Sequence, residues 1–196
     1  MVMIKEKNLE LPLIQGGMGI GVSLGNLAGH VAKAGGMGVI SAANPGYGEA
    51  DFWERPAEAN RRALEREIKK AKEIAGGRGL VAVNAMVATA EYQAAVETAI
   101  SAGCDAIISG AGLPAALPGF RGADKAALAP IVSSPKAART ILRLWDKRFG
   151  RQPDFLVLEG SRAGGHLGFR REELISGGAK SLEDLLGEVL AEVSAF

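Results

Sequence analysis

The sequence is poor in cysteine, histidine and aromatic residues, with one Cys, two His, two Tyr and two Trp among 196 residues. A single cysteine excludes an internal disulfide and is typical of a reducing compartment. Cys104 lies in the apolar run Gly103–Ile108, so we expect an unreactive thiol in the core. The sequence has no paired thiolates, no second histidine near His166 and no carboxylate cluster, so we predict no metal site.

The sequence also lacks an excess of either charge, because 23 basic and 22 acidic residues leave a net charge of +1. The basic residues are dispersed and few aromatic rings could stack on bases, so we expect neither nucleic acid nor an acidic membrane as a partner. No apolar run approaches the ~20 residues that span a bilayer, and the N-terminus lacks the pattern of a signal peptide. We therefore expect a soluble, cytoplasmic protein.

The sequence does contain 27 glycines and short apolar runs that alternate with helical patterns. No linker divides it, so we predict one domain over residues 1–196. The runs are almost continuously apolar, which is typical of parallel strands covered on both faces. The predicted strands are Leu11–Gln15, Gly38–Ser41, Leu80–Asn84, Ala106–Ser109, Ala129–Ser133 and Phe155–Glu159.

Apolar residues with helical spacing predict helices between these strands, including one over residues 55–75 and one around Tyr92–Ile100. Serines indicate where three others begin: Ser23 as the cap of the first helix, Ser134 before Pro135, and Ser181 in a capping box with Asp184. In the last helix we expect six apolar side chains to face inward: Leu182, Leu185, Leu186, Val189, Leu190 and Val193.

Repeated strand–helix alternation predicts right-handed βαβ units, which build either a doubly wound sheet or most of a (β/α)8 barrel. A dinucleotide fingerprint is incomplete here, because Leu24 stands where its third glycine is expected and the strand at Ser41 ends without the ribose-binding acid. We therefore predict an α/β fold of the TIM type, a (β/α)8 barrel truncated after the sixth β/α unit. In such a barrel the residues that follow the strands share one face.

Those residues are uncharged apart from Glu159 and Arg162, and rich in amides, hydroxyls and glycine. They are Gln15–Gly19, Ser41, Asn84, Ser109–Gly112, Ser133–Ser134 and Glu159–Gly168. Such a set suits a flat, neutral, hydrogen-bonding ligand such as a flavin ring. A Ser-His-acid nucleophile is possible from the residue types, but no Gly-x-Ser-x-Gly elbow is present.

The segment Glu159–Gly168 follows a predicted strand directly and combines a carboxylate, a glycine-rich loop and His166. Glycines allow close approach of a backbone to a ligand, and histidine transfers protons near neutral pH. The alternative is an ordinary turn at Ala163–Gly165 with a solvated histidine. The other histidine, His30, falls within the first predicted helix, where we expect a surface residue.

Four segments resemble the nitronate monooxygenase family, formerly called 2-nitropropane dioxygenase, which includes flavin-dependent enoyl-ACP reductases. They are Pro12–Gly19, Gly35–Ser41, Val83–Asn84 and Glu159–Gly168. The resemblance implies a TIM-type barrel that binds FMN non-covalently and oxidises nitronates or nitroalkanes. It further implies that the backbone of Gly17, Met18 and Gly19 lines the flavin and that Asn84 hydrogen-bonds the ring.

By the same resemblance, Ser109 and Ser133 lie near the polar edge of the flavin. Glu159, Gly164 and Gly165 shape the cofactor side of the pocket, and His166 is the catalytic residue that faces the substrate.

Two departures from the family keep other functions open. The segment Ser109–Gly112 lacks a histidine that some nitronate monooxygenases carry there, which leaves reduction of an enoyl thioester as an alternative. Only six strands are predicted, whereas strands 7 and 8 usually supply the phosphate-binding loops of such barrels. Open strand edges are a liability, so we expect a homo-oligomer or a partner chain that covers them, and weak FMN binding by the isolated chain. An inactive fragment or subunit is the third alternative.

Overall fold

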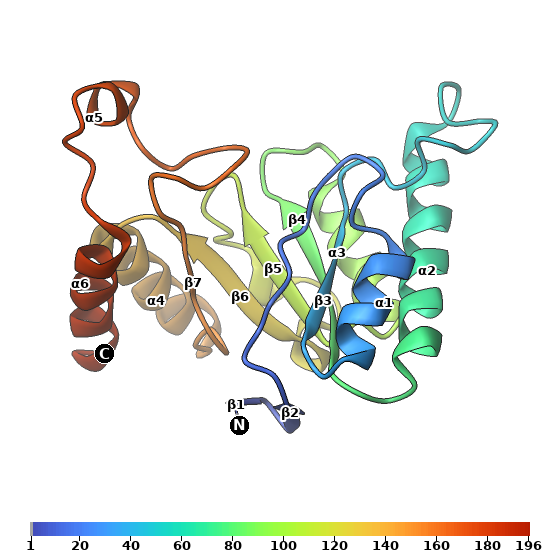
Figure 1. The fold of residues 1–196 in the computed structure, drawn as a ribbon, viewed down its shortest axis with the longest axis horizontal. Helices are drawn as coiled ribbons and strands as arrows, with labels where there is room; N and C mark the ends of the chain where they lie inside the picture. Colours follow the sequence, from blue (N-terminus) through green and yellow to red (C-terminus); the bar gives the residue numbers. More distant parts are fainter. Residues whose placement is uncertain (1) are drawn as a thin grey trace.

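The centre of the fold is a parallel sheet of five strands in the order β3-β4-β5-β6-β7. The computed structural model describes residues 2–196. Figure 1 shows the sheet curved into half of a barrel, with helices on its outer side. This confirms the predicted TIM-type arrangement. The strands are β3 Met37–Ser41, β4 Leu80–Met86, β5 Ala106–Gly110, β6 Ala127–Val132 and β7 Val157–Leu158.

The helices begin and end close to the predicted positions. Their bounds are α1 Gly25–Lys33, α2 Pro56–Ala75, α3 Tyr92–Ser101, α4 Pro135–Phe149, α5 Arg171–Ile175 and α6 Leu182–Ser194, with short 3-10 helices at Leu117–Gly119 and Ala123–Lys125. Two predicted caps are confirmed. The hydroxyl of Ser134 accepts the N–H of Ala137 at 3.2 Å, and that of Ser181 accepts the N–H of Asp184 at 3.1 Å. Within residues 2–196 no helix has the length and apolar character needed to cross a membrane.

Alternation of side chains along the strands separates two apolar clusters, one on each face of the sheet. Ile107 of β5 packs in the outer cluster under the helices, whereas its neighbour Ile108 packs in the inner cluster. Cys104 is buried in the outer cluster, as expected. Burial raises the pKa of its thiol to about 12, so the thiol stays protonated at neutral pH.

A short antiparallel hairpin, β1 Val2–Ile4 with β2 Lys7–Leu9, covers the amino ends of the strands (Figure 1). Ile4 and Leu9 are buried in the inner cluster, and Lys7 forms an ion pair with Asp105 at the start of β5. Sequence analysis missed this hairpin because strands of three residues are too short to produce a recognisable alternation.

The predicted first strand, Leu11–Gln15, is reduced to one parallel bridge between Ile14 and Met37. Two physical reasons apply. Pro12 has no N–H to donate, and the N–H of Leu13 turns back to the carbonyl of Leu11 at 2.7 Å. The segment also has β3 on one side only, so Leu11, Leu13 and Ile14 remain exposed at the edge of the sheet.

The prediction for the last helix is correct in extent but wrong for four of its six inward residues. Leu185 and Val189 are buried against the fold, and α6 packs on α4, where Arg139 donates to Glu192 at 2.7 Å. Nothing in the described chain covers the other side of α6. As a result, four predicted inward residues are exposed: Leu182, Leu186, Leu190 and Val193.

Candidate functional site

The residues predicted to form the site lie near or just beyond the carboxyl ends of the strands, which are at the top of Figure 1. The first of these segments, Gly16–Leu24, passes over the ends of β3 and β4. A β-carbon on Gly17 would lie 2.6 Å from Cβ of Asn84, and one on Gly19 would lie 2.9 Å from Cβ of Ala43. Only glycine therefore allows this backbone to approach the sheet so closely.

A partly buried hydrogen-bond network holds this glycine loop in place. The Gln15 side chain accepts the N–H of Val39 at 3.0 Å and donates to the hydroxyl of Ser23 at 2.8 Å. The same hydroxyl accepts the N–H of Met18 at 2.9 Å and donates to the carbonyl of Gly16 at 3.2 Å. Ser23 is fully buried, so every polar atom of its side chain is used inside the loop.

The prediction that Ser23 caps the first helix is therefore wrong. The N-cap residue of α1 is Leu24, which makes no side-chain cap. A serine just before a helix favours both arrangements equally, because its hydroxyl can bond either the helix or the preceding loop. The glycines before Ser23 were the one available signal for the loop arrangement.

Asn84 lies on β4 with its side chain on the concave, inner face of the sheet. Its neighbours Val83 and Ala85 belong to the outer cluster, and its register partners are Ser41 on β3 and Ile108 on β5. The side chain is half-buried beside Gly17. In the part of the chain that the structure describes, no hydrogen bond to its amide is found, so both its donor and acceptor are available to a ligand.

Ser109 does not lie with the other predicted site residues. Its hydroxyl is fully buried on the outer side of β5, where it lies 2.7 Å from the hydroxyl of Tyr92 and donates to the carbonyl of Ala85 at 3.0 Å. Burial raises the pKa of Tyr92 to about 12, although the hydrogen bond to Ser109 opposes this shift. The Ser109 side chain is thus unavailable to a ligand on the concave face. Side chains alternate along a strand, so Ser109 points outward, whereas its two neighbours in β5 lie on the concave side.

Glu159 and Ser133, from neighbouring strand ends, both bind Gly168 and so close the loop that carries His166. A Glu159 oxygen accepts the N–H of Gly168 at 2.8 Å, and the Ser133 hydroxyl donates to its carbonyl at 3.0 Å. A β-carbon on Gly168 would collide with the Ser133 hydroxyl. We call these contacts the Gly168 clasp.

His166 is exposed near the far end of this loop, after Gly165, which has a φ of +87°. Gly164 and Gly165 have open space where a side chain would stand. The imidazole has no hydrogen-bond partner within residues 2–196, so its ring is accessible. The structure therefore places Glu159, Ser133 and His166 in one loop assembly and Gly17–Gly19 with Asn84 in another.

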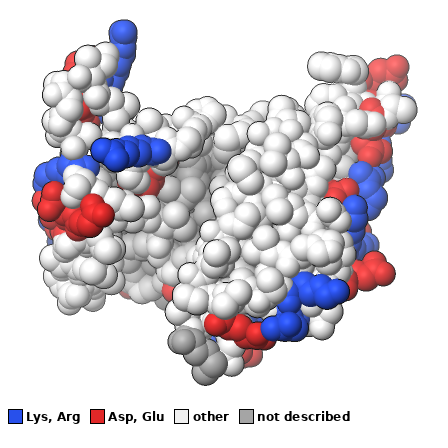
Figure 2. All heavy atoms as spheres, viewed as in Figure 1, with Lys and Arg blue, Asp and Glu red and all other residues white. Residues whose placement is uncertain are grey.

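The concave face between these assemblies carries almost no charge. Figure 2 shows a hollowed, mostly uncharged centre, with the charged side chains gathered over α2 on one side, over α5 and α6 on the other, and near the hairpin. Within the described residues no group of His, Cys, Asp and Glu could hold a metal ion. Amide, hydroxyl and backbone groups thus dominate the polar lining.

Solved structures with the same arrangement confirm the fold. The chain is similar to FabK from Thermotoga maritima, with a TM-score of 0.67 and 22% identity over 94% of this chain and 48% of that one. It is also similar to a nitroalkane oxidase from Streptomyces ansochromogenes, with a TM-score of 0.70 and 20% identity over 94% and 56% of the two chains. The chain thus spans about half the length of the solved structures it matches.

No curated protein resembles the chain closely enough to count as a relative. The family model described as nitronate monooxygenase, in contrast, matches residues 1–194, which is almost the whole sequence. The glycine loop over β3 and β4, the inward amide of Asn84 and the Gly168 clasp all lie within this match. The chain belongs to the nitronate monooxygenase family.

Proposed function

We propose that the concave face binds FMN and that the chain takes part in the oxidation of nitronates. The observation that carries this proposal is the contact between Gly17 and Asn84, which brings the backbone of the glycine loop against a free amide on the concave face of the sheet. Membership of the nitronate monooxygenase family supports the assignment of the ligand.

The residues present fit a flavin. Its ring system is flat and uncharged, with carbonyl and N–H groups along its edge, and the Asn84 amide can both donate and accept. Gly164 and Gly165 have no atom within 4 Å of the position of a β-carbon, so the backbone at these points is open to a ring. We propose that Gly17, Met18, Gly19 and Asn84 hold one side of it.

When bound, FMN supplies the redox chemistry of such a site, and the protein orients and polarises the reactants. We propose that His166 hydrogen-bonds the anionic nitro group of a nitronate or removes the α-proton of a neutral nitroalkane. Glu159 and Ser133 hold the His166 loop through Gly168. Gly164 and Gly165 leave space beside that loop on the cofactor side.

We also propose that a second copy or a partner chain covers the open edges at Leu11–Ile14 and β7 in the active protein, because exposed strand edges and apolar side chains favour association. Analytical ultracentrifugation of the purified chain tests this proposal. A mass above that of one chain is expected, and a monomer at all concentrations contradicts it.

Replacement of His166 by Ala tests the catalytic assignment. Turnover of a nitronate, measured as oxygen uptake, should fall by about 10²-fold. This lies within the usual range for loss of a general acid or base. The visible absorbance of bound flavin should be unchanged, because Gly17–Gly19 and Asn84 remain. Unchanged turnover would exclude His166 from the reaction.

Reduction of an enoyl thioester is the second candidate. It is favoured by the absence of a histidine in Ser109–Gly112. It is also supported by FabK, an enoyl-ACP reductase of the same family, to which the chain is about as similar as to nitroalkane oxidase. Oxidation of NAD(P)H that is stimulated by an enoyl-CoA identifies this activity, whereas oxygen uptake with a nitronate identifies the first. A chain that retains no flavin after incubation with FMN and removal of the unbound FMN is instead an inactive fragment or subunit.

A further inference from the structure

The first helix, α1, begins without a cap from its own sequence. Its N-cap residue is Leu24, whose side chain cannot accept a hydrogen bond. Instead, the N–H of Gly25 donates to a carboxylate oxygen of Glu67 at 2.9 Å. Glu67 belongs to α2, which lies much later in the sequence. The approach is so close that a β-carbon on Gly25 would collide with the Glu67 carbonyl oxygen.

Glu67 is unusual because it is an acidic residue that is only 8% exposed. Such residues are rarely buried unless they are paired. Its partners are the N–H of Gly25 and the guanidinium of Arg66, whose Nε lies 3.5 Å from the other carboxylate oxygen. A negative charge at the start of α1 is also favourable, because the helix dipole is positive there.

The glycine loop ends directly at the start of α1. Ser23, two residues before Gly25, holds Met18 through its hydroxyl, and its carbonyl accepts the N–H of Ser41 at 2.9 Å. A displacement of Gly25 therefore displaces Ser23 and with it the loop that lies against Asn84. Within residues 2–196 no hydrogen bond joins the side chain of Glu67 to the loop residues from Gly16 to Gly21.

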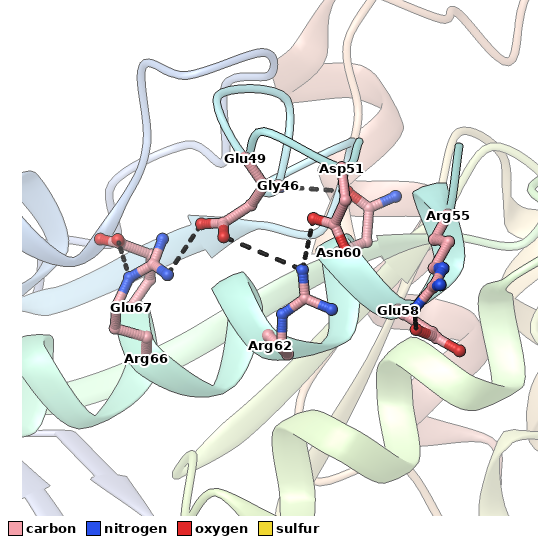
Figure 3. A network of polar contacts seen from close by, with 9 residues as sticks. All are labelled: Gly46, Glu49, Asp51, Arg55, Glu58, Asn60, Arg62, Arg66 and Glu67. Carbon is pink, nitrogen blue, oxygen red and sulfur yellow. Dashed lines mark hydrogen bonds and ion pairs between the residues drawn. The ribbon is translucent and has the colours of Figure 1, made fainter. Parts of the chain in front are cut away.

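Figure 3 shows how Glu67 is held in turn. Arg66 lies between Glu67 and Glu49, and its Nη1 donates to Glu49 at 2.8 Å. Glu49 belongs to the segment between β3 and α2, which is also tied to α2 by Arg62 with Asp51 at 2.6 Å and by Asn60 with the N–H of Gly46 at 3.0 Å. Ion pairs on the surface of α2 thus continue inward to a single buried carboxylate.

From these contacts we propose that Glu67 is a positioning residue: its carboxylate caps α1 and thereby fixes the glycine loop that receives the flavin. This inference rests on the proposed function only for the identity of the ligand. The capping contact and its link to Ser23 stand without it.

The test uses Glu67→Ala with Glu65→Ala as a matched control, because Glu65 is on the same helix, its side chain is 41% exposed, and its ion pair within residues 2–196 is with Lys69. Hydrogen exchange is measured in the flavin-free protein at the amides of Gly25 and Met18, and the dissociation constant of FMN is measured by titration. For Glu67→Ala both amides should exchange about tenfold faster and FMN should bind about tenfold more weakly, the size expected for loss of a hydrogen bond to a charged group. Glu65→Ala should change neither quantity.

Glu67→Gln keeps an oxygen that can accept the N–H of Gly25 but removes the charge, so its exchange rates should fall between wild type and Glu67→Ala. This intermediate result also carries the test if the alanine variant does not fold. Wild-type exchange at Gly25 and Met18 in the Glu67 variants overturns the inference. Faster exchange in a protein whose wild type binds no FMN supports the positioning of the loop and overturns the proposed function instead.

Discussion

The two loops that face each other across the concave side of the sheet are held in very different ways. The glycine loop near Gly17 is fixed by a fully buried serine, by the Gln15 side chain and by the Glu67 cap on α1. The His166 loop is fixed mainly by the exposed Gly168 clasp. Buried hydrogen bonds are stronger and costlier to break than exposed ones. We infer that the glycine loop is the more rigid of the two and that the His166 loop is the more easily displaced.

The largest expected effect comes from filling the contact between Gly17 and Asn84. Gly17→Val places a branched side chain where even a β-carbon lies 2.6 Å from Asn84, so the loop must move away from the sheet. FMN affinity should fall by at least about 10²-fold, since overpacking costs about 1–3 kcal/mol and the bonds of the amide are lost as well.

The matched control for Gly17→Val is Gly16→Ala, because nothing lies within 4 Å of a β-carbon at Gly16. Its dissociation constant for FMN, measured by fluorescence quenching, should equal that of the wild type. Equal losses in the two variants would mean that the contact with Asn84 is not what shapes the pocket.

A substitution in the Gly168 clasp disturbs the His166 loop and leaves the glycine loop unchanged. In Gly168→Ala the new methyl collides with the Ser133 hydroxyl, so the loop loses its anchor, whereas the control Gly187→Ala, on α6, has open space. We expect turnover of a nitronate to fall about tenfold or more in Gly168→Ala, because misplacement of a catalytic group by about 1 Å can cost that much or more. FMN affinity should fall less than turnover, because Gly17 and Asn84 on the other side of the proposed site stay in place.

A loss of FMN affinity in Gly168→Ala as large as the loss of turnover would break the comparison. It would show that the His166 loop is part of the cofactor site. Steady-state oxygen uptake and FMN titration, carried out on the same preparation, separate these outcomes.

Removal of the Ser23 hydroxyl should mainly affect stability. Ser23→Ala removes the partner of the partly buried N–H of Met18 and of the Gln15 amide, and the free energy of unfolding should fall by about 1–3 kcal/mol. Ser134→Ala, which removes the α4 cap, should cost about 1 kcal/mol. Urea denaturation monitored by circular dichroism measures both losses. If Ser23→Ala is as stable as the wild type, the described hydrogen-bond network is contradicted.

The smallest effect concerns Ser109 and Tyr92, which lie outside both loops. The pKa of Tyr92 is raised to about 12, above the ordinary value of 10, so the unfolded chain releases this proton more easily. Between pH 10 and 12 the stability of the fold should therefore decrease as pH rises. Tyr92→Phe should reduce this slope while FMN affinity at neutral pH stays unchanged, and a slope as steep as in wild type would contradict the shift.

Much of the sheet could be predicted from the sequence because its interior strands are covered on both faces. The apolar runs at Leu80–Asn84 and Ala106–Ser109 became β4 and β5 for that reason. The run at Leu11–Gln15 has the same apolar character but has a neighbour on only one side, and a sequence pattern carries no information on missing neighbours. The exposed face of α6 has the same explanation.

The site was predictable in its residue types more than in its contacts. Asn84 and Glu159 follow from their place at strand ends, whereas Ser109 differs from a residue on the concave face only by a shift of one position. The role of Glu67 could not be predicted from the sequence. Its contact with Gly25 joins two helices, and the local sequence of neither helix indicates that contact.

The central claim is that Asn84 and the glycine loop form one side of an FMN site. It is tested most directly by titrating FMN into the purified wild-type chain and into Asn84→Ala and following flavin fluorescence. The account predicts saturable binding by the wild type and about tenfold weaker binding by Asn84→Ala, the loss of roughly one hydrogen bond. Absence of saturable binding, or equal dissociation constants for the two proteins, would contradict it.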